Sequence, residues 1–294
     1  MIRWRVLFPP YIWLLVLFLL PFGIVFKISL SDYAISVPPY DPKFDFSAGM
    51  AAIWQSFQQL DFESYKWLIE DRLYFRAYVS SLTIAAISTF VALVIAYPMA
   101  YAMARSPQSW RALLMMLVIL PFWSSFLIRI YAWIGILSNE GFLNMTLEWM
   151  GLPTVQVINT NTAVYIGVVY AYLPFMILPI YAALDRMDPS LLEAAEDLGC
   201  TRIEAFWRIT WPLSRPGVIA GCFLVFIPVI GEFVIPSLLG GSNTLMIGKI
   251  LWEEFFNNRD WPVASAVAVV LLFLLIIPIV LFQRQQLKDQ EAQT

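Results

Sequence analysis

The sequence predicts an all-α membrane protein with six transmembrane helices. Hydrophobic residues make up 60% of its 294 residues and charged residues 13%, and the mean hydropathy is +0.73. A soluble core with a polar surface cannot be arranged from that composition. A helix needs roughly 20 apolar residues to cross about 30 Å of hydrocarbon. Six such runs occur, near residues 9–30, 77–103, 112–137, 162–183, 217–239 and 263–282.

The first run is expected to remain as an anchor, because it is full-length and lacks a small-residue cleavage site at its end. The polar, aromatic-rich segment that follows contains a turn at Pro38-Pro39 and predicts a small extramembrane region. The sequence therefore predicts an N-terminal helix at residues 1–30 and an extramembrane segment at 31–76. A five-helix core follows at 77–282, with a long internal loop at 184–216, and the tail is 283–294.

The positions of Lys and Arg predict the orientation. Ten lie at the N-terminus, in the 104–111 turn, in the 184–216 loop and in the tail, and six lie in the loops on the other side. Basic residues favour the cytoplasmic side, so both termini and the 184–216 loop are predicted to be cytoplasmic. The outer loops carry twelve acidic residues against those six basic ones. This excess would attract cations, although a solvated acidic loop is the simpler interpretation.

Enzyme chemistry is disfavoured. The chain has no His, which removes the commonest general base and metal ligand. Its two cysteines, Cys200 in the loop and Cys222 in the fifth run, are placed neither for a disulfide nor for a metal cluster. The Gly248-Lys249 pair has Asn243 where a phosphate loop requires glycine. We therefore expect no metal and no cofactor, and if ATP is used, another subunit binds it.

The stretch DPSLLEAAEDLGCTRIEAFWRITWP, residues 188–212, predicts two short helices in the loop. Asp188 can cap the first, and Gly199 supplies a left-handed stop one residue past its end. Thr201 caps the second with Glu204 in a capping box, and Pro212 is expected to bound it. Leu191, Ala195 and Leu198 share one face of the first helix, and the paired alanines allow another surface to approach closely. This design suits docking into a groove on a partner.

These residues resemble the cytoplasmic EAA loop of type I ABC importer permeases, in which a coupling helix seats in a cleft of the ATPase subunit. The residues that match the motif are Glu193, Ala194, Ala195, Gly199, Ile209 and Pro212. Two positions depart from the usual pattern: Cys200 replaces alanine, and Trp211 replaces leucine. The second change is expected to alter how the second helix packs.

The resemblance extends over nearly the whole chain to the polyamine importer permeases, and is closest to the putrescine type. It is carried by PFWSSFLIRIYAW (121–133), VYAYLPFMILPIYAALDRMD (169–188), VFIPVIGEFVIPSLLGG (225–241) and IGKILWEEFFNNRDWPVASAVA (247–268). The resemblance implies a bacterial inner-membrane complex with a second homologous permease, two ATP-binding subunits and a periplasmic polyamine-binding protein. Lipid surrounds the complex, and no nucleic acid is expected as a partner.

Two ionisable residues are predicted to lie inside the membrane, Arg129 in the outer half of the third helix and Glu232 in the outer half of the fifth. Such residues usually face a cavity or a partner. Glu232 could pair with Arg129, or it could face the pathway and offset the charge of a cationic substrate while carbonyls freed near Pro121 or the partner permease satisfy Arg129. The aromatic candidates for the pathway are Trp123, Tyr131 and Tyr172. Their rings could bind an alkylammonium ion, or they could anchor helices at the membrane interface.

The sequence thus predicts half of a gated pathway for a polyamine, putrescine before spermidine, powered by ATP hydrolysis in partner subunits. A permease for a different small solute is the first alternative. A membrane-embedded enzyme is the second, and it is disfavoured because no paired carboxylates or metal-ligand cluster lie within the predicted helices.

Overall fold

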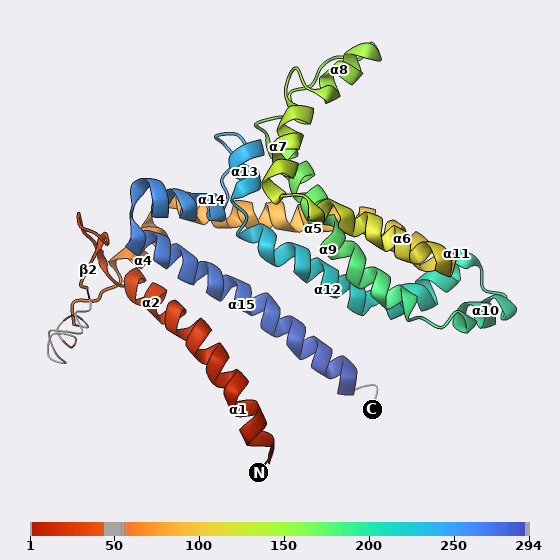
Figure 1. The fold of residues 1–294 in the computed structure, drawn as a ribbon, viewed down its shortest axis with the longest axis horizontal. Helices are drawn as coiled ribbons and strands as arrows, with labels where there is room; N and C mark the ends of the chain where they lie inside the picture. The colour runs from red at the N-terminus through yellow and green to blue at the C-terminus, as the bar shows by residue number, and fades with distance from the viewer. Residues whose placement is uncertain (1, 44–53, 55, 57, 292–294) are drawn as a thin grey trace. The chain divides into compact units, whose positions relative to one another are not determined.

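The computed structural model describes the chain except residues 1, 44–53, 55, 57 and 292–294. The chain forms two compact units, and Figure 1 labels their helices and strands. Unit 1 consists of Met1–Tyr78 and Ile250–Thr294, and unit 2 of Val79–Lys249.

Unit 1 combines an N-terminal and a C-terminal segment of the chain. Its elements are α1 (Ile2–Leu14), η1 (Leu15–Leu19), α2 (Leu20–Ser29), β1 (Asp32–Tyr33), β2 (Tyr40–Asp41), α4 (Glu63–Glu70), the start of α5 (Arg72–Arg105), the end of α14 (Ile247–Trp252), η4 (Glu253–Asn258) and α15 (Trp261–Glu291). Helix α15 packs against α2 and α4. Strands β1 and β2 pair antiparallel, with Tyr33 opposite Tyr40, so Pro38 and Pro39 lie in the connection between them and the predicted turn is confirmed.

Buried polar contacts hold unit 1 where its segments meet. The hydroxyl of Tyr74 donates to Glu254 Oε1 at 2.9 Å, and the Asn258 amide donates to Glu254 Oε2 at 2.8 Å. The hydroxyl of Tyr78 donates to the Val267 carbonyl at 2.8 Å. Pairing buried polar groups in this way removes the cost of leaving them unsatisfied. These bonds tie the start of α5 to η4 and α15.

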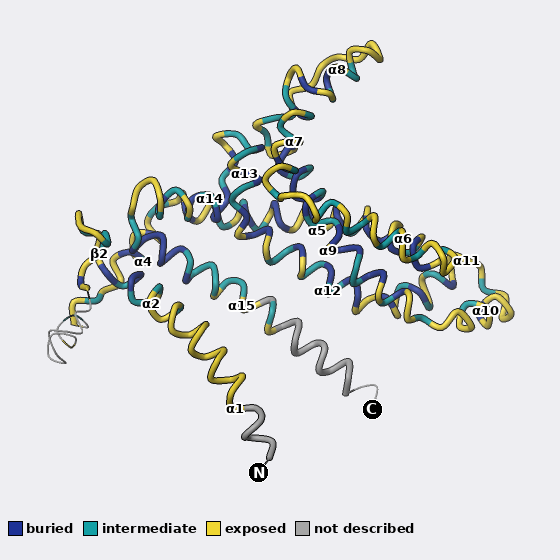
Figure 2. The backbone as a smooth tube through the Cα atoms, viewed as in Figure 1, coloured by how far each residue is buried: buried dark blue, intermediate teal, exposed yellow. Residues whose placement is uncertain are grey.

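Unit 2 is a helical bundle. Its elements are the rest of α5, α6 (Gln108–Ile119), η2 (Leu120–Trp123), α7 (Phe126–Leu137), α8 (Phe142–Trp149), α9 (Asn161–Asp185), α10 (Ser190–Asp197), α11 (Arg202–Ala205), η3 (Phe206–Thr210), α12 (Trp211–Ile230), α13 (Val234–Leu239) and the start of α14. Buried residues run along α9 and α12 (Figure 2).

Helices α9 and α12 pack closely because α12 presents glycine to α9. A Cβ atom at Gly217 would lie 2.5 Å from the Pro179 carbonyl oxygen and 2.6 Å from the Ala183 Cβ, and one at Gly221 would lie 2.8 Å from the Met176 sulfur. Small residues four apart let two membrane helices approach to backbone contact. A hydrogen bond of 2.9 Å between the Tyr97 and Ser214 hydroxyls joins α5 to α12.

Four described helical stretches are long and apolar enough to cross a membrane: Phe8–Ser29, Arg72–Arg105, Asn161–Asp185 and Arg202–Ile230. A fifth span is possible if Gln108–Trp123 and Phe126–Trp149, bent by 89° at their junction, count together. The apolar part of α15 that is described, Trp261–Ile277, is shorter. A mostly helical architecture with several apolar helices of membrane-spanning length is thus observed, and the count of six spans stays a prediction.

Two of the predicted apolar runs are each divided between two helices in the structure. The third, 112–137, is interrupted by η2 and a bend before α7. Pro121 lies in η2, and proline both lacks an N–H and crowds the preceding turn of a helix. The fifth, 217–239, ends as α12 at Ile230 and restarts as α13 at Val234. Arg129 and Glu232 therefore lie beside helix breaks rather than in uninterrupted helices.

Candidate functional site

The first candidate region is the 184–216 loop, whose first helix is α10. The Asp188 carboxylate accepts the N–H of Ser190 at 3.0 Å, as the predicted cap requires, and this backbone hydrogen bond holds the pKa of Asp188 below its usual value. Leu191 and Leu198 are exposed, whereas Ala195 is buried. Ala195 is therefore the buried member of the face that it was predicted to share with the two leucines. The alanine exposed between the two leucines is Ala194.

A left-handed glycine ends α10. Gly199 has φ of +80°, its N–H donates to the Glu196 carbonyl at 2.9 Å, and the Cys200 N–H donates to the Ala195 carbonyl at 2.9 Å. This pair of bonds satisfies two of the last carbonyls of the helix. No atom lies within 4 Å of a Cβ placed at Gly199, so the backbone conformation, and not the space around it, requires glycine.

The second helix of the loop begins as predicted but does not end as predicted. The Thr201 hydroxyl accepts the Glu204 N–H at 3.3 Å, and the Glu204 carboxylate accepts the Thr201 N–H at 2.9 Å, which completes the capping box. The helix then continues through η3 into α12, past Pro212. A helical proline crowds the turn before it, and here that turn is η3, a wider π-helical turn. Pro212 therefore lies at the start of a membrane helix instead of ending the loop helix.

Trp211 takes part in an aromatic cluster that anchors the loop to α5. Its ring lies 5.5 Å from Tyr97 and 5.9 Å from Trp207, and Phe206 lies 5.7 Å from Tyr97, all measured between ring centroids. Ile209, which precedes Trp211 by two residues, is half-buried. The tryptophan that departs from the family pattern thus adds contact between the loop and the bundle.

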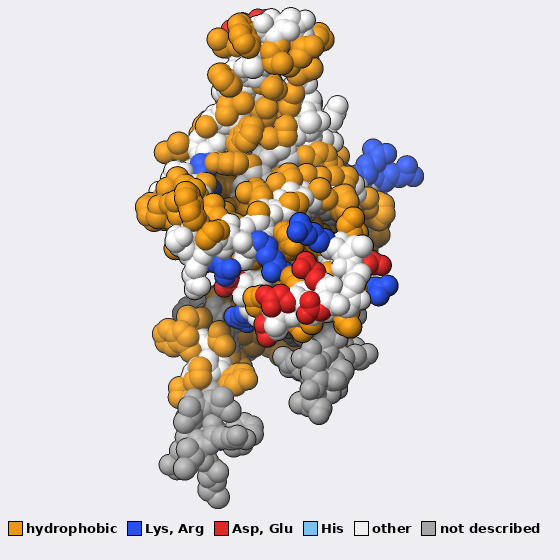
Figure 3. Space-filling model, turned by 90° about the vertical axis from the view of Figure 1, so that its right-hand side faces the viewer, with side chains coloured by type: hydrophobic (Ala, Val, Ile, Leu, Met, Phe, Trp, Pro, Cys, Tyr) orange, Lys and Arg blue, Asp and Glu red, His pale blue; other side chains and the backbone are white. Residues whose placement is uncertain are grey.

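Charged side chains surround this end of unit 2 (Figure 3). A cavity of about 330 Å³ opens beside α10, and its charged lining residues are Arg105, Glu193, Glu196 and Arg202. Glu193 is exposed. This cavity is lined by acidic and basic side chains, and α10 also carries exposed leucines. Such a surface can bind side chains of a partner.

The second candidate region is the break between α12 and α13, where Glu232 is 8% exposed. Its Oε1 accepts the N–H groups of Val234 at 2.9 Å and Ile235 at 3.4 Å. Its Oε2 accepts the hydroxyl hydrogen of Tyr172, from α9, at 2.6 Å. Each carboxylate oxygen is hydrogen-bonded, so the side chain is held in one position.

Arg129 does not meet Glu232. No ion pair between these two is found among the described residues, where the two ion pairs present join Lys66 to Glu70 and Arg111 to Asp185. Instead, the Arg129 guanidinium lies over the Phe122 ring, 4.9 Å from its centroid, and 5.7 Å from that of Phe126.

Three aromatic rings nevertheless connect the two charges. Phe122 meets Phe175 edge-on at 5.2 Å, and Phe175 lies 6.0 Å from Tyr172, which is bonded to Glu232. We call Phe122, Phe175 and Tyr172 the aromatic run. The sequence had suggested Tyr172, but Phe122 and Phe175 were missed. The signal for Phe175 was its place three residues after Tyr172, on the same side of a helix.

The other two aromatic candidates lie on the surface. Trp123 is 77% exposed and Tyr131 is 58% exposed, and neither contributes to the aromatic run. Exposed rings on a membrane protein can contact lipid or a partner subunit.

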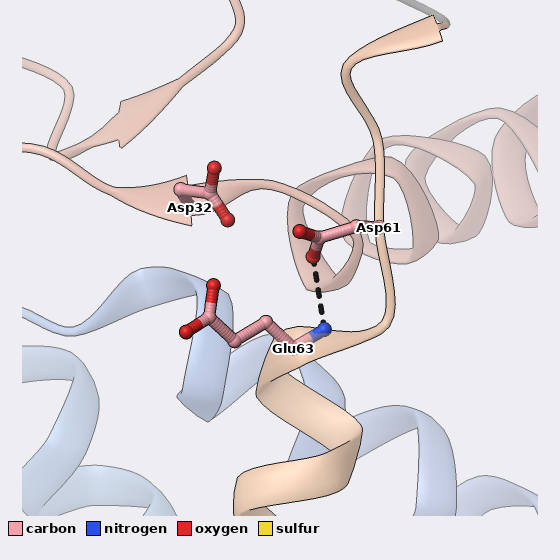
Figure 4. Close-up of side chains that lie close together, drawn as sticks. All are labelled: Asp32, Asp61 and Glu63. Carbon is pink, nitrogen blue, oxygen red and sulfur yellow. Dashed lines mark hydrogen bonds between the residues drawn. The ribbon is translucent and has the colours of Figure 1, made fainter.

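Among the described residues, a cluster of three carboxylates in unit 1 has its oxygens close enough together to contact one cation. Asp32, Asp61 and Glu63 are all exposed, and their oxygens lie within 4.8 Å of one another (Figure 4). Asp61 accepts the Glu63 N–H at 2.9 Å. Burial and then the neighbouring carboxylates raise the pKa of Asp32. Exposed acidic groups of this kind are common without an ion, and no metal is assigned to them.

Comparison with known proteins agrees with this architecture. Residues 77–286 match the family described as the inner membrane component of binding-protein-dependent transport systems. The spermidine/putrescine transport system permease protein PotB of Escherichia coli is 42% identical over 216 residues, which cover 73% of this chain and 78% of that protein. PotB of Haemophilus influenzae is 43% identical over 214 residues, covering 72% and 75%.

A solved structure shares the fold. It is a bacterial alginate ABC transporter in complex with an alginate pentasaccharide-bound periplasmic protein, with a TM-score of 0.68, 19% identity, and coverage of 96% of this chain and 92% of that chain. At this identity the likeness concerns the fold alone, and that fold is the type I ABC importer permease fold. Together with the family match over most of the chain, it shows that this protein belongs to the inner membrane components of binding-protein-dependent transport systems, and is a permease subunit of an ABC transporter rather than an enzyme.

Proposed function

We propose that this permease imports polyamines and forms half of their pathway through the membrane. The observation that carries the proposal is the nearly buried carboxylate of Glu232 at a helix break, bonded to Tyr172 at one end of the aromatic run. A fixed carboxylate attracts an alkylammonium group, and aromatic faces bind such a group by cation–π attraction. Broken helices are where membrane transporters commonly place their substrate sites. The named specificity of the PotB relatives supports the same class of substrate.

In this proposal the partners are a second homologous permease, two ATP-binding subunits and a periplasmic polyamine-binding protein. The EAA residues Glu193, Ala194, Gly199, Ile209 and Pro212 couple the chain to an ATP-binding subunit. Leu191 and Leu198 give α10 an apolar outer face, and the adjoining charged cavity completes a surface suited to docking. Buried Ala195 supports this face from within.

Uptake of labelled amines tests the substrate. Cells that carry the whole transporter, with and without this gene, are given labelled putrescine, spermidine or a control amino acid. We expect gene-dependent uptake of putrescine and spermidine, with putrescine preferred as the sequence resemblance implies. The relatives' names pair the two amines, so both must be measured. Uptake of neither amine would refute the proposal, and spermidine preference would correct its finer part.

Cysteine labelling tests the proposed orientation, with both termini in the cytoplasm. In a chain without Cys200 and Cys222, a cysteine placed at exposed Ser190 in α10 should react only from the cytoplasmic side. A cysteine at exposed Asn257 should react only from outside. Asn257 is preferable to Asn258, whose amide donates to buried Glu254. The reverse labelling pattern would overturn the orientation derived from Lys and Arg.

A further inference from the structure

Arg129 is a cation held by aromatic rings. Its guanidinium lies over Phe122 and near Phe126 at centroid distances of 4.9 and 5.7 Å. Within the described part of the chain, its buried Nε has no hydrogen-bond partner, and no carboxylate forms an ion pair with it. The attraction of the rings for its charge is therefore a main interaction that keeps the guanidinium in place.

The ring under Arg129 belongs to the aromatic run. From Phe122 the run leads through Phe175 to Tyr172 and the Glu232 carboxylate. The run thus has an anion at one end and a cation of the protein at the other. A polyamine that binds at Glu232 and extends along the rings would approach Arg129 with its next ammonium group.

We infer that Arg129 competes with the substrate for the face of the Phe122 ring. Its guanidinium occupies that face until an ammonium group of the polyamine displaces it. This competition sets how strongly the permease retains the polyamine. The inference rests on the proposed polyamine function. Two effects act in the same direction. Arg129 blocks the ring that an ammonium group would use, and its positive charge repels that group. Weaker binding of the polyamine is useful in a transporter that must release its substrate, because conduction requires sites that a cation can leave.

Direct binding tests the inference, because uptake also reflects capture by the binding protein. The complete transporter, in lipid nanodiscs and without the binding protein, is titrated with labelled putrescine. Arg129→Gln should lower the half-saturating concentration by about threefold, the effect expected from removing one cation–π competitor. Arg129→Lys, which keeps the charge but not the planar guanidinium, should give an intermediate value. Arg76→Gln, at an exposed arginine early in α5, is the control and should change nothing.

A second variant shows that the effect acts through the ring. In a Phe122→Leu background, Arg129→Gln should give no further gain, because the contested ring is absent. An unchanged or raised half-saturating concentration in Arg129→Gln would overturn the inference. So would an equally large decrease of that concentration when Arg129→Gln is added to Phe122→Leu. The inference also fails if no variant binds putrescine although the transporter takes it up in cells. Should Arg129→Gln fail to insert, the Arg129→Lys value decides. Wild-type cells that take up no polyamine would instead refute the proposed function.

Discussion

Replacing Gly199 with valine is expected to reduce transport at least tenfold while the chain still reaches the membrane. Gly199 has φ of +80°, and a left-handed conformation costs an L-residue about 1 to 2 kcal/mol, more for a β-branched one. The two hydrogen bonds that end α10 require this conformation. Valine should therefore redirect the chain between α10 and α11, and the ATP-binding subunit should no longer be retained. Co-purification of that subunit and putrescine uptake measure the effect.

Two matched variants separate docking from backbone strain. Gly151 also has a positive φ, +71°, and open space around its Cβ position, but it follows α8 in the loop predicted to be outside. Gly151→Val should keep the ATP-binding subunit bound. Gly199→Asn should retain much of the transport, because asparagine tolerates the left-handed region. If Gly199→Val inserts normally, fails to transport and still holds the ATP-binding subunit at full strength, the coupling role is wrong.

The loop could be predicted closely because its signals are local. Asp188, Gly199 and the Thr201–Glu204 pair each act on the backbone within three residues, so sequence spacing alone indicates them. Pro212 was misjudged because its effect depends on the π-helical turn that precedes it. Spacing alone placed Leu191, Ala195 and Leu198 on one face of α10, but it could not indicate that Ala195 is buried while the two leucines are exposed.

The region around Glu232 and Arg129 was harder to predict because its contacts are distant in sequence. Hydropathy identifies apolar runs, but it does not register the break after Ile230 or the bend before Phe126, since both flanking pieces are apolar. Glu232 was singled out because a charged side chain is costly in a membrane. Its partner Tyr172 lies 60 residues away, and rings rather than a carboxylate hold Arg129. Neither relation could be read from spacing.

Glu232→Gln is expected to leave the chain at its normal level in the membrane and to weaken polyamine uptake at least tenfold. The glutamine oxygen can still accept the N–H groups of Val234 and Ile235, and its amide can donate to the Tyr172 hydroxyl, so the local hydrogen bonds survive. The substitution removes the negative charge that we propose offsets the substrate's charge. Removing an opposite charge from a site shielded from water costs more than 1.4 kcal/mol, which corresponds to a tenfold change.

Two further variants separate this role from a structural one. Glu232→Ala removes the acceptor of the Val234 and Ile235 N–H groups at the start of α13. It should lower abundance as well as uptake, since a buried donor left unsatisfied costs about 1 to 3 kcal/mol. Tyr172→Phe keeps the carboxylate charge and its backbone bonds, so it should impair uptake less than Glu232→Gln does.

Combining Glu232→Gln with Arg129→Gln completes the argument. A pathway role predicts little recovery of uptake, because the carboxylate that attracts the substrate is still missing. A structural pair between the two residues predicts instead a low abundance in the single variant that the double variant largely restores. The structure favours the first outcome, since Glu232 is hydrogen-bonded to Tyr172 and the α13 backbone, and Arg129 lies against the rings of Phe122 and Phe126 instead of a carboxylate. Normal uptake and abundance in the single variant would refute both roles.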